Sequence, residues 1–232
     1  MALDRRNLHP AVQVGYAELA RDILLNGFWM TRPPEQLMGW VVGSDNDQLC
    51  SSARSTIDVT CFTEVRLSQA EEHSKQYGLL GIGVERKFVL DRRGGPVHYV
   101  RNGPRETVVG NSLALFWYLQ EKDAQVQAEL MRRNIGFLKP MSNPGEDDYA
   151  YLDEHEWRII HSHEEEKRGL IVRTGLERPF YRIPVQPADV RLIVFPDADT
   201  RRLATDDEQI RSFFLREKKL PIFLTLEDCR DF

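Results

Sequence analysis

The chain has 232 residues, a net charge of −5 and 41% hydrophobic residues, values that are ordinary for a globular protein. Its three cysteines are an odd number without a C-x-x-C pair, so neither a disulfide framework nor a cysteine zinc site is predicted, and a reducing compartment is favoured. The negative charge does not indicate tight nonspecific nucleic-acid binding, although a local basic groove is compatible with it. No segment has the pattern of a signal peptide or a transmembrane helix, so we expect a cytoplasmic protein.

The first hundred residues predict one helix, a long loop and several strands. Apolar spacing predicts a helix over residues 17–27 that ends at Gly27. We expect a long irregular excursion at about residues 31–55, where proline, glycine, asparagine and aspartate cluster. The strands predicted here from alternating polar and apolar residues are 57–62, 79–84 and 97–100.

Helical spacing appears again in the middle of the chain, and strands dominate the last eighty residues. A polar helix is predicted over residues 67–76, and the longest helices are expected within residues 109–134. A shorter helix is predicted over residues 208–215. The strands predicted in the second half are 156–161, 170–172, 180–183, 190–195 and 221–224.

The order of these elements predicts the fold class. Strands come in runs and do not alternate regularly with helices, which indicates an α+β fold with a mostly antiparallel or mixed sheet and packed helices. No internal repeat or low-complexity linker interrupts the chain, so we expect a single domain over residues 1–232.

Two stretches contain closely spaced motifs. The first reads CFTEVRL at residues 61–67, HSKQYG at 73–78 and GPVHYV at 95–100, and the second reads DEHEWR at 153–158. Motifs in this order and spacing resemble the AbiGi family of abortive-infection proteins. The resemblance implies a part in prokaryotic antiphage defence together with a protein partner from the same operon. The chain would either restrain or accompany a toxic effector, or be the effector itself.

Glu156 and Arg158 are the first candidates for a functional site. On a strand they share one face, while Trp157 lies on the other face and anchors the strand in the core. The functional interpretation is a carboxylate held near an arginine at a cleft. The structural interpretation, which we favour, is a half-buried ion pair that fixes the edge of a sheet.

His73, Tyr77 and Glu64 are the second group of candidates. His73 and Tyr77 are four residues apart, so they lie on the same face of the predicted helix and can reach one pocket, where Glu64 could join them. We expect these three side chains to approach Glu156 and Arg158. The alternative is a solvated helix, because the neighbouring residues are polar.

One enzymatic hypothesis unites these five candidates. The order of an early strand and helix, a Tyr-Gly element and a late strand glutamate is similar to that of ADP-ribosyltransferases. That similarity implies a split sheet, NAD as the cofactor and Glu156 as the carboxylate that orients the ribose while nicotinamide leaves. Whether the chain is an enzyme stays open.

Nuclease chemistry is a weaker alternative. Asp58, Glu85 and Lys87 have the spacing of a metal-dependent nuclease half-site, but such short patterns arise by chance. The motif R-x4-H occurs at residues 93–98 and 158–163, and neither segment predicts the helix that HEPN-type ribonucleases need.

A metal site is conceivable after the strand that contains Glu156. His161 and His163 precede three glutamates, residues 164–166, and could collect a divalent ion if this loop folded back. We interpret the segment as a solvated turn between strands and predict no metal site, because a metal needs a matched third or fourth ligand and a second shell.

Overall fold

The computed structural model describes most of the chain and supports the α+β assignment. The described residues are 8–32, 38–41, 48–51, 57–101, 107–141, 154–177, 180–215 and 220–232. Parts of the expected excursion and Asp153 of the second motif lie outside this set. Among the described residues, no helix is both long and apolar enough to span a membrane.

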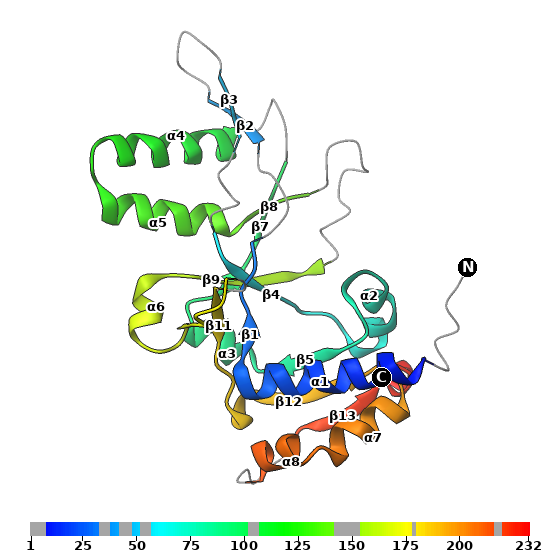
Figure 1. Ribbon diagram of the computed structural model, residues 1–232. Helices are drawn as coiled ribbons and strands as arrows, with labels where there is room; N and C mark the ends of the chain where they lie inside the picture. Colours follow the sequence, from blue (N-terminus) through cyan, green and yellow to red (C-terminus); the bar gives the residue numbers. More distant parts are fainter. Residues whose placement is uncertain are drawn as a thin grey trace.

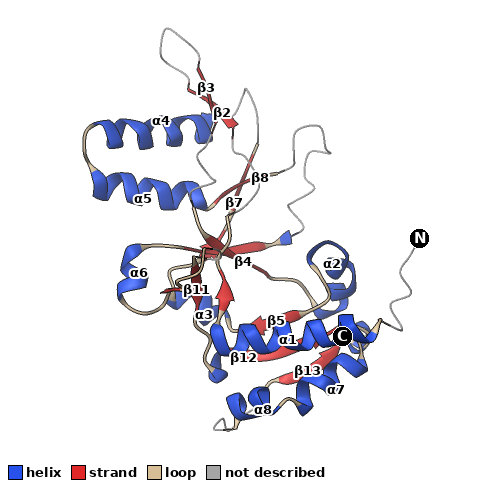
Figure 2. Ribbon diagram, viewed as in Figure 1, coloured by secondary structure: helices blue, strands red, loops and turns tan. Residues whose placement is uncertain are grey.

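Helices and strands are short and interspersed (Figures 1 and 2). The helices are α1 (Pro10–Asn26), α2 (Ala70–Tyr77), α3 (Arg86–Asp91), α4 (Thr107–Glu121), α5 (Gln125–Gly136), α6 (His163–Lys167), α7 (Ala198–Asp206) and α8 (Glu208–Phe214), with 3₁₀ turns η2 (Leu67–Gln69), η4 (Pro187–Asp189) and η5 (Asp228–Asp231). The strands are β1 (Phe28–Trp29), β2 (Met38–Val41), β3 (Gln48–Ser51), β4 (Val59–Thr63), β5 (Gly81–Val84), β6 (Gly95–Pro96), β7 (His98–Val100), β8 (Leu138–Pro140), β9 (Glu156–Ile160), β10 (Val172–Arg173), β11 (Tyr181–Ile183), β12 (Val190–Phe195) and β13 (Ile222–Thr225).

The strands form several small sheets. Three sheets have the strand orders β1-β11-β10, β13-β12-β5 and β4-β9-β6, and two further pairs are β2-β3 and β7-β8. The pairs β12-β13 and β7-β8 are parallel, and all the others are antiparallel. This mixed, mainly antiparallel pairing confirms the predicted fold class and differs from a doubly wound parallel sheet.

Strand β9 lies between two hydrophobic clusters. Successive residues of a strand point to opposite faces, so Ile159 packs in the main core while Ile160 packs in a second cluster with residues of α4, α5 and β8. Both side chains are buried, at 0% and 1% exposure. Glu156 and Arg158 share the face of Ile160, and Trp157 shares the face of Ile159. A charged side chain on β9 is therefore buried and needs a charged or hydrogen-bonding partner inside the protein.

The main core joins the N-terminal helix to the C-terminal third of the chain. Helix α1 packs against α7 and α8 beside the β13-β12-β5 sheet (Figure 1). The buried residues of this cluster include Ala20, Leu24, Phe88, Ile183, Ile193, Phe195, Ala204, Ile210 and Phe214. The second cluster lies under the hairpin of α4 and α5, which projects from the rest of the molecule at the upper left of Figure 1.

Most predicted elements are confirmed, and several predictions need correction. The helical pattern of residues 109–134 breaks into α4 and α5 at Asp123, which has φ 53°. The longest continuous helix is α1, with 17 residues, which begins earlier than predicted and ends before Gly27 as expected. The excursion at residues 31–55 contains the antiparallel β2-β3 hairpin.

The other two corrections concern β9 and the segment after it. Strand β9 is the central strand of β4-β9-β6 and not a sheet edge. The expected solvated turn forms helix α6, whose N-cap Ser162 accepts a hydrogen bond from the backbone N–H of Glu165. Serine at this position satisfies a backbone donor that the first helical turn leaves unpaired, which is why the helix begins there.

Candidate functional site

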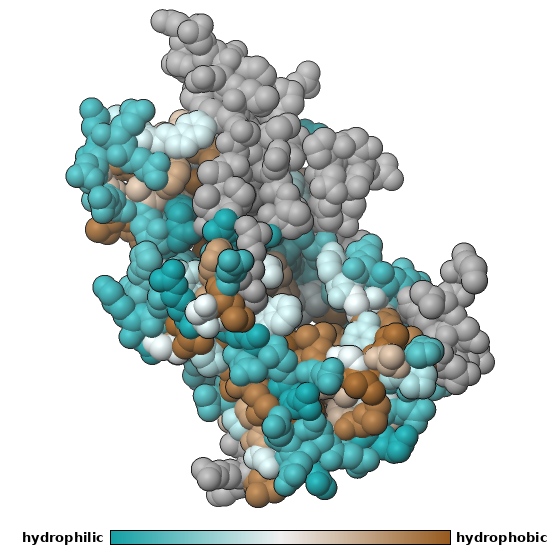
Figure 3. Space-filling model, viewed as in Figure 1, coloured by the Kyte–Doolittle hydropathy of each residue, from teal (hydrophilic) through white to brown (hydrophobic). Residues whose placement is uncertain are grey.

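A cavity of about 570 Å³ opens where β4, β5, α2 and β9 meet. Its walls are mainly apolar and its rim carries polar side chains, as in many ligand sites. The apolar lining includes Phe28, Phe62, Leu67, Leu79, Ile82, Val89, Leu192, Val194 and Leu226. Figure 3 shows hydrophobic side chains at the surface between α2 and α1.

Strand β5 forms one wall of this cavity and depends on glycine to do so. Gly83 pairs with Leu192 of β12, and a Cβ atom on Gly83 would lie 2.7 Å from Cγ of Leu192. The absence of a side chain therefore lets Leu192 cover the strand. This close packing explains why residue 83 is glycine.

His73 and Tyr77 lie together on α2 and line the cavity, as their spacing predicts. Their rings stack with centroids 4.4 Å apart and an interplanar angle of 25°. Burial lowers the pKa of His73 from its usual value, and the negative charge of Glu154 opposes that shift only partly. His73 is therefore favoured as a neutral imidazole, which can accept as well as donate a hydrogen bond.

Glu64 forms the rim of the cavity with Arg86 and Trp157. Arg86 makes an ion pair with Glu64, and its guanidinium lies 5.6 Å from the centroid of the Trp157 ring. Glu64 and Arg86 are both largely exposed, so this pair stabilises the fold weakly. It presents one carboxylate and one guanidinium at the mouth of an apolar cavity.

A smaller recess adjoins the cavity and contains Glu156. It is lined by Glu64, Pro96, Val97, Tyr99, His155, Glu156 and Trp157. The hydroxyl of Tyr99 accepts a hydrogen bond of 3.1 Å from the backbone N–H of Glu156, and burial raises the pKa of Tyr99. Glu64 and Trp157 border both the cavity and this recess.

Glu156 belongs to a buried cluster of four charged side chains. Nε of Arg158 donates to Oε1 of Glu156 at 2.5 Å, and Nζ of Lys139 donates to Oε2 of Glu156 at 2.5 Å. Lys139 also pairs with Glu154, and Arg158 donates to the carbonyl of Gly136 at 3.0 Å. The four side chains are at most 10% exposed. Two carboxylates and two cations thus balance inside the protein.

This arrangement holds Glu156 in its charged form. Burial on its own would raise the pKa of Glu156, but the charge and hydrogen bond of Arg158 and hydrogen bonds from Cys61 and Lys139 outweigh it and lower the pKa to about 2. The two carboxylates likewise outweigh the burial of Lys139 and raise its pKa. Glu156 is therefore not a carboxylic acid that can give up a proton near neutral pH.

Cys61 contacts the same cluster from β4. It pairs with Arg158 across the antiparallel ladder, and its thiol hydrogen-bonds to Glu156. Although Cys61 is an exposed residue overall, desolvation of the thiol and the negative charge of Glu156 raise its pKa to about 12. The group is therefore a protonated thiol at neutral pH and a poor nucleophile.

The structure groups the five predicted site residues in two sets. His73, Tyr77 and Glu64 line the cavity, and Glu156 lies in the recess beside it. Arg158 lines neither space and is 0% exposed, because its face of β9 points toward α5 and β8. Lys139, which completes the charged cluster together with Glu154, carried no sequence signal, because it lies on β8 in a separate segment of the chain.

The nuclease candidates are engaged elsewhere. Glu85 pairs with Arg191, Lys87 with Asp91 and Asp58 with Arg32. Neither R-x4-H motif lies on one helix, as predicted: the first includes β6, and the second runs from β9 to His163, the first residue of α6.

Comparison with known proteins gives one finding. The sequence model of the family described as "Putative abortive phage resistance protein AbiGi, antitoxin" matches residues 42–174, which is more than half of the chain. The matched range contains both motif stretches, the cavity wall of α2 and the α4-α5 hairpin. No curated protein and no solved structure matches the chain.

Proposed function

Because the chain belongs to the AbiGi family of abortive phage resistance proteins, we propose that it is an antitoxin-like component that restrains a toxic protein from its own defence operon by binding it. The family description provides the setting of abortive infection and the antitoxin role. The surface of the protein provides a candidate for the contact with the partner.

The observation that carries this proposal is the exposed apolar surface of the α4-α5 hairpin. Leu115 and Tyr118 are 44% and 55% exposed on α4, and Val126 and Leu130 are 71% and 55% exposed on α5. The hairpin projects from the molecule (Figure 1), and its inner side packs on the second hydrophobic cluster. Exposed apolar side chains of this size on a protruding element are typical of protein interfaces.

The state of Glu156 supports a binding function over a catalytic one. Both of its carboxylate oxygens already bind buried cations, which engages the group that would have to orient a ribose. The alternative is an ADP-ribosyltransferase-like effector that uses NAD, with Glu156 as the catalytic carboxylate. What favours it is the position of Glu156 in a recess beside the larger cavity.

Co-expression with the neighbouring gene of the operon tests the proposal. The chain should be harmless alone and should restore growth when the neighbouring protein is toxic. Leu130→Asp and Tyr118→Asp should abolish this rescue, because losing a central interface residue costs about 2 kcal/mol or more, about 30-fold in Kd. Leu176→Asp is the matched control, since Leu176 is also 55% exposed but lies between β10 and β11.

Two results would reject the proposal. Full rescue by both hairpin variants would show that the contact lies elsewhere. The second result is growth inhibition by the chain alone and NAD consumption by the purified protein. If Glu156→Gln abolished both effects, the chain would instead be identified as the effector.

A further inference from the structure

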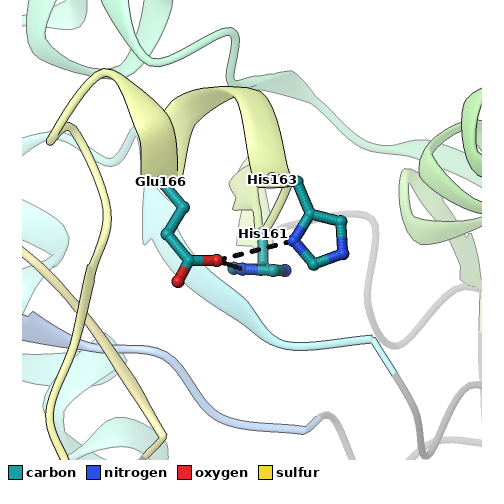
Figure 4. Close-up of side chains that lie close together, drawn as sticks. All are labelled: His161, His163 and Glu166. Carbon is teal, nitrogen blue, oxygen red and sulfur yellow. Dashed lines mark hydrogen bonds and ion pairs between the residues drawn. The ribbon is translucent and has the colours of Figure 1, made fainter.

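The segment that leaves β9 turns back so that three side chains with metal-binding atoms meet. His161 follows the strand, Ser162 caps α6, and His163 and Glu166 lie one helical turn apart on that helix. Residues at positions i and i+3 share a helix face. Figure 4 shows both imidazole rings next to the carboxylate of Glu166.

The distances within this trio fit a metal ion. Nε2 of His161 lies 3.2 Å and Nδ1 of His163 lies 3.6 Å from Oε2 of Glu166, and the three ligand atoms lie within 4.8 Å of one another. Zinc bonds of about 2.0 to 2.2 Å in tetrahedral geometry place neighbouring ligand atoms roughly 3.3 to 3.5 Å apart. Two of the three separations are already close to that value. His163 is 77% exposed, so a change of its side-chain rotamer can shorten the third separation.

His161 is held in position through both its ring and its main chain. Its ring stacks on Tyr181 with centroids 3.9 Å apart and an interplanar angle of 29°. Arg132 fixes its main chain by donating to the carbonyl oxygen at 3.1 Å.

The surrounding charges leave Glu166 available. Glu164 pairs with Arg93, and the buried Glu165 pairs with Arg93 and Arg133. Among the ion pairs of the described residues, Glu166 pairs only with the two histidines. The nearby charge of Arg132 is compensated by two hydrogen bonds of 2.7 Å to Glu129.

We propose that His161, His163 and Glu166 form a binding site for a divalent transition metal ion of the zinc class, with a fourth coordination position open to water. Two imidazole nitrogens and one carboxylate are the ligand set of zinc, whereas magnesium and calcium prefer oxygen ligands. Such an ion would tie the end of β9 to α6.

Zinc content after equilibration measures the site directly. Tag-free protein is incubated with Zn²⁺, freed of excess metal by gel filtration, and analysed by inductively coupled plasma mass spectrometry. The wild type should retain about one more zinc ion per chain than His163→Ala and Glu166→Gln. Since all proteins contain the same cysteines, the difference reports only the trio. Glu164→Gln, on the same helix, and His98→Ala, another exposed histidine, should match the wild type.

Cobalt binding provides a second measurement, which reports the coordination geometry of the site. Added Co²⁺ should give the wild type the visible absorption of a tetrahedral or five-coordinate nitrogen and oxygen site, and Zn²⁺ should raise its Tm. Both effects should be missing in His163→Ala, whose Tm without metal should equal that of the wild type. No zinc in the wild type, or equal zinc in either His163→Ala or Glu166→Gln, would overturn the proposal.

Discussion

A buried carboxylate such as Glu156 stabilises a fold only while it stays charged and paired. Taking charges out of water is costly, and only the attraction of Lys139 and Arg158 together with good hydrogen bonds compensates that cost. Removing one member leaves a buried charge without its partner. The four residues of this cluster should therefore respond to substitution as a unit, with effects that do not add.

Glu156→Gln should lower the free energy of unfolding by about 3 kcal/mol at pH 7, because it removes one partner of a buried pair. The same pairing also determines how the free energy of unfolding depends on pH. The pKa of Glu156 is lowered from 4.5 to about 2, so its stabilisation is fully present above pH 4.5 and is lost as the pH falls toward 2. Urea unfolding at a series of pH values should show the gap between wild type and variant closing over this interval.

Glu64→Gln provides the comparison for that experiment. Glu64 is half exposed and its pair with Arg86 lies at the surface, so the change should cost less than about 1 kcal/mol. An equal loss in both variants, or a gap for Glu156→Gln that is as large at pH 3 as at pH 7, would contradict the assignment of Glu156 to a structural cluster.

At the scale of elements, the sequence predicts those strands and helices whose side chains have regular spacing. Strand β9 was predicted within one residue, but its alternation of charged and apolar residues looked like a half-exposed edge strand. Both of its faces are buried, because the charges of Glu156 and Arg158 are paired inside. The break between α4 and α5 carries no glycine or proline, so no residue type marks where α4 ends.

The candidate site shows the same limit. The four-residue spacing of His73 and Tyr77 predicted their stacking on one helix face, because only local geometry was needed. Lys139 is 15 and 17 residues from the glutamates it binds, and no local pattern connects them. His163 and Glu166 lie next to His161 because helix α6 begins at its N-cap, Ser162. From the sequence, this segment was interpreted as a turn.

The turn after α3 allows a sharp test at this scale. A Cβ atom on Gly94 would lie 2.6 Å from the backbone oxygen of Arg158, and a main-chain atom of a central strand cannot move aside easily. Gly94→Ala should therefore lower the free energy of unfolding by about 1 to 3 kcal/mol, as overpacking does. The loss should appear in urea denaturation as a lower midpoint.

Gly15→Ala is the matched control for this change. Gly15 lies inside α1 and a Cβ atom there meets nothing within 4 Å, so alanine should be neutral or stabilise by up to about 1 kcal/mol. An unchanged free energy of unfolding in Gly94→Ala would show that α3 and β9 can move apart without cost. That result would contradict the conclusion that Gly94 is needed for the close approach to the backbone of β9.

At the scale of the whole molecule, β9 connects two hydrophobic clusters that use opposite faces of one strand. The main core contains α1 and the C-terminal helices, and the second cluster contains the α4-α5 hairpin. A single shared strand can couple two clusters into one folding unit, or each cluster can unfold separately. We propose that the chain is a single domain, because both clusters include buried residues of the same strand, β9.

Conservative substitutions at neighbouring positions of β9 test this proposal. Ile159→Val removes one methyl group from the main core, and Ile160→Val removes one from the second cluster. Each should cost about 0.5 to 1.5 kcal/mol, so both variants should still fold. If the chain is one cooperative unit, differential scanning calorimetry should show one transition that both substitutions move to lower temperature. Two transitions, with Ile159→Val moving only one and Ile160→Val moving only the other, would instead show that each face of β9 belongs to a separate domain.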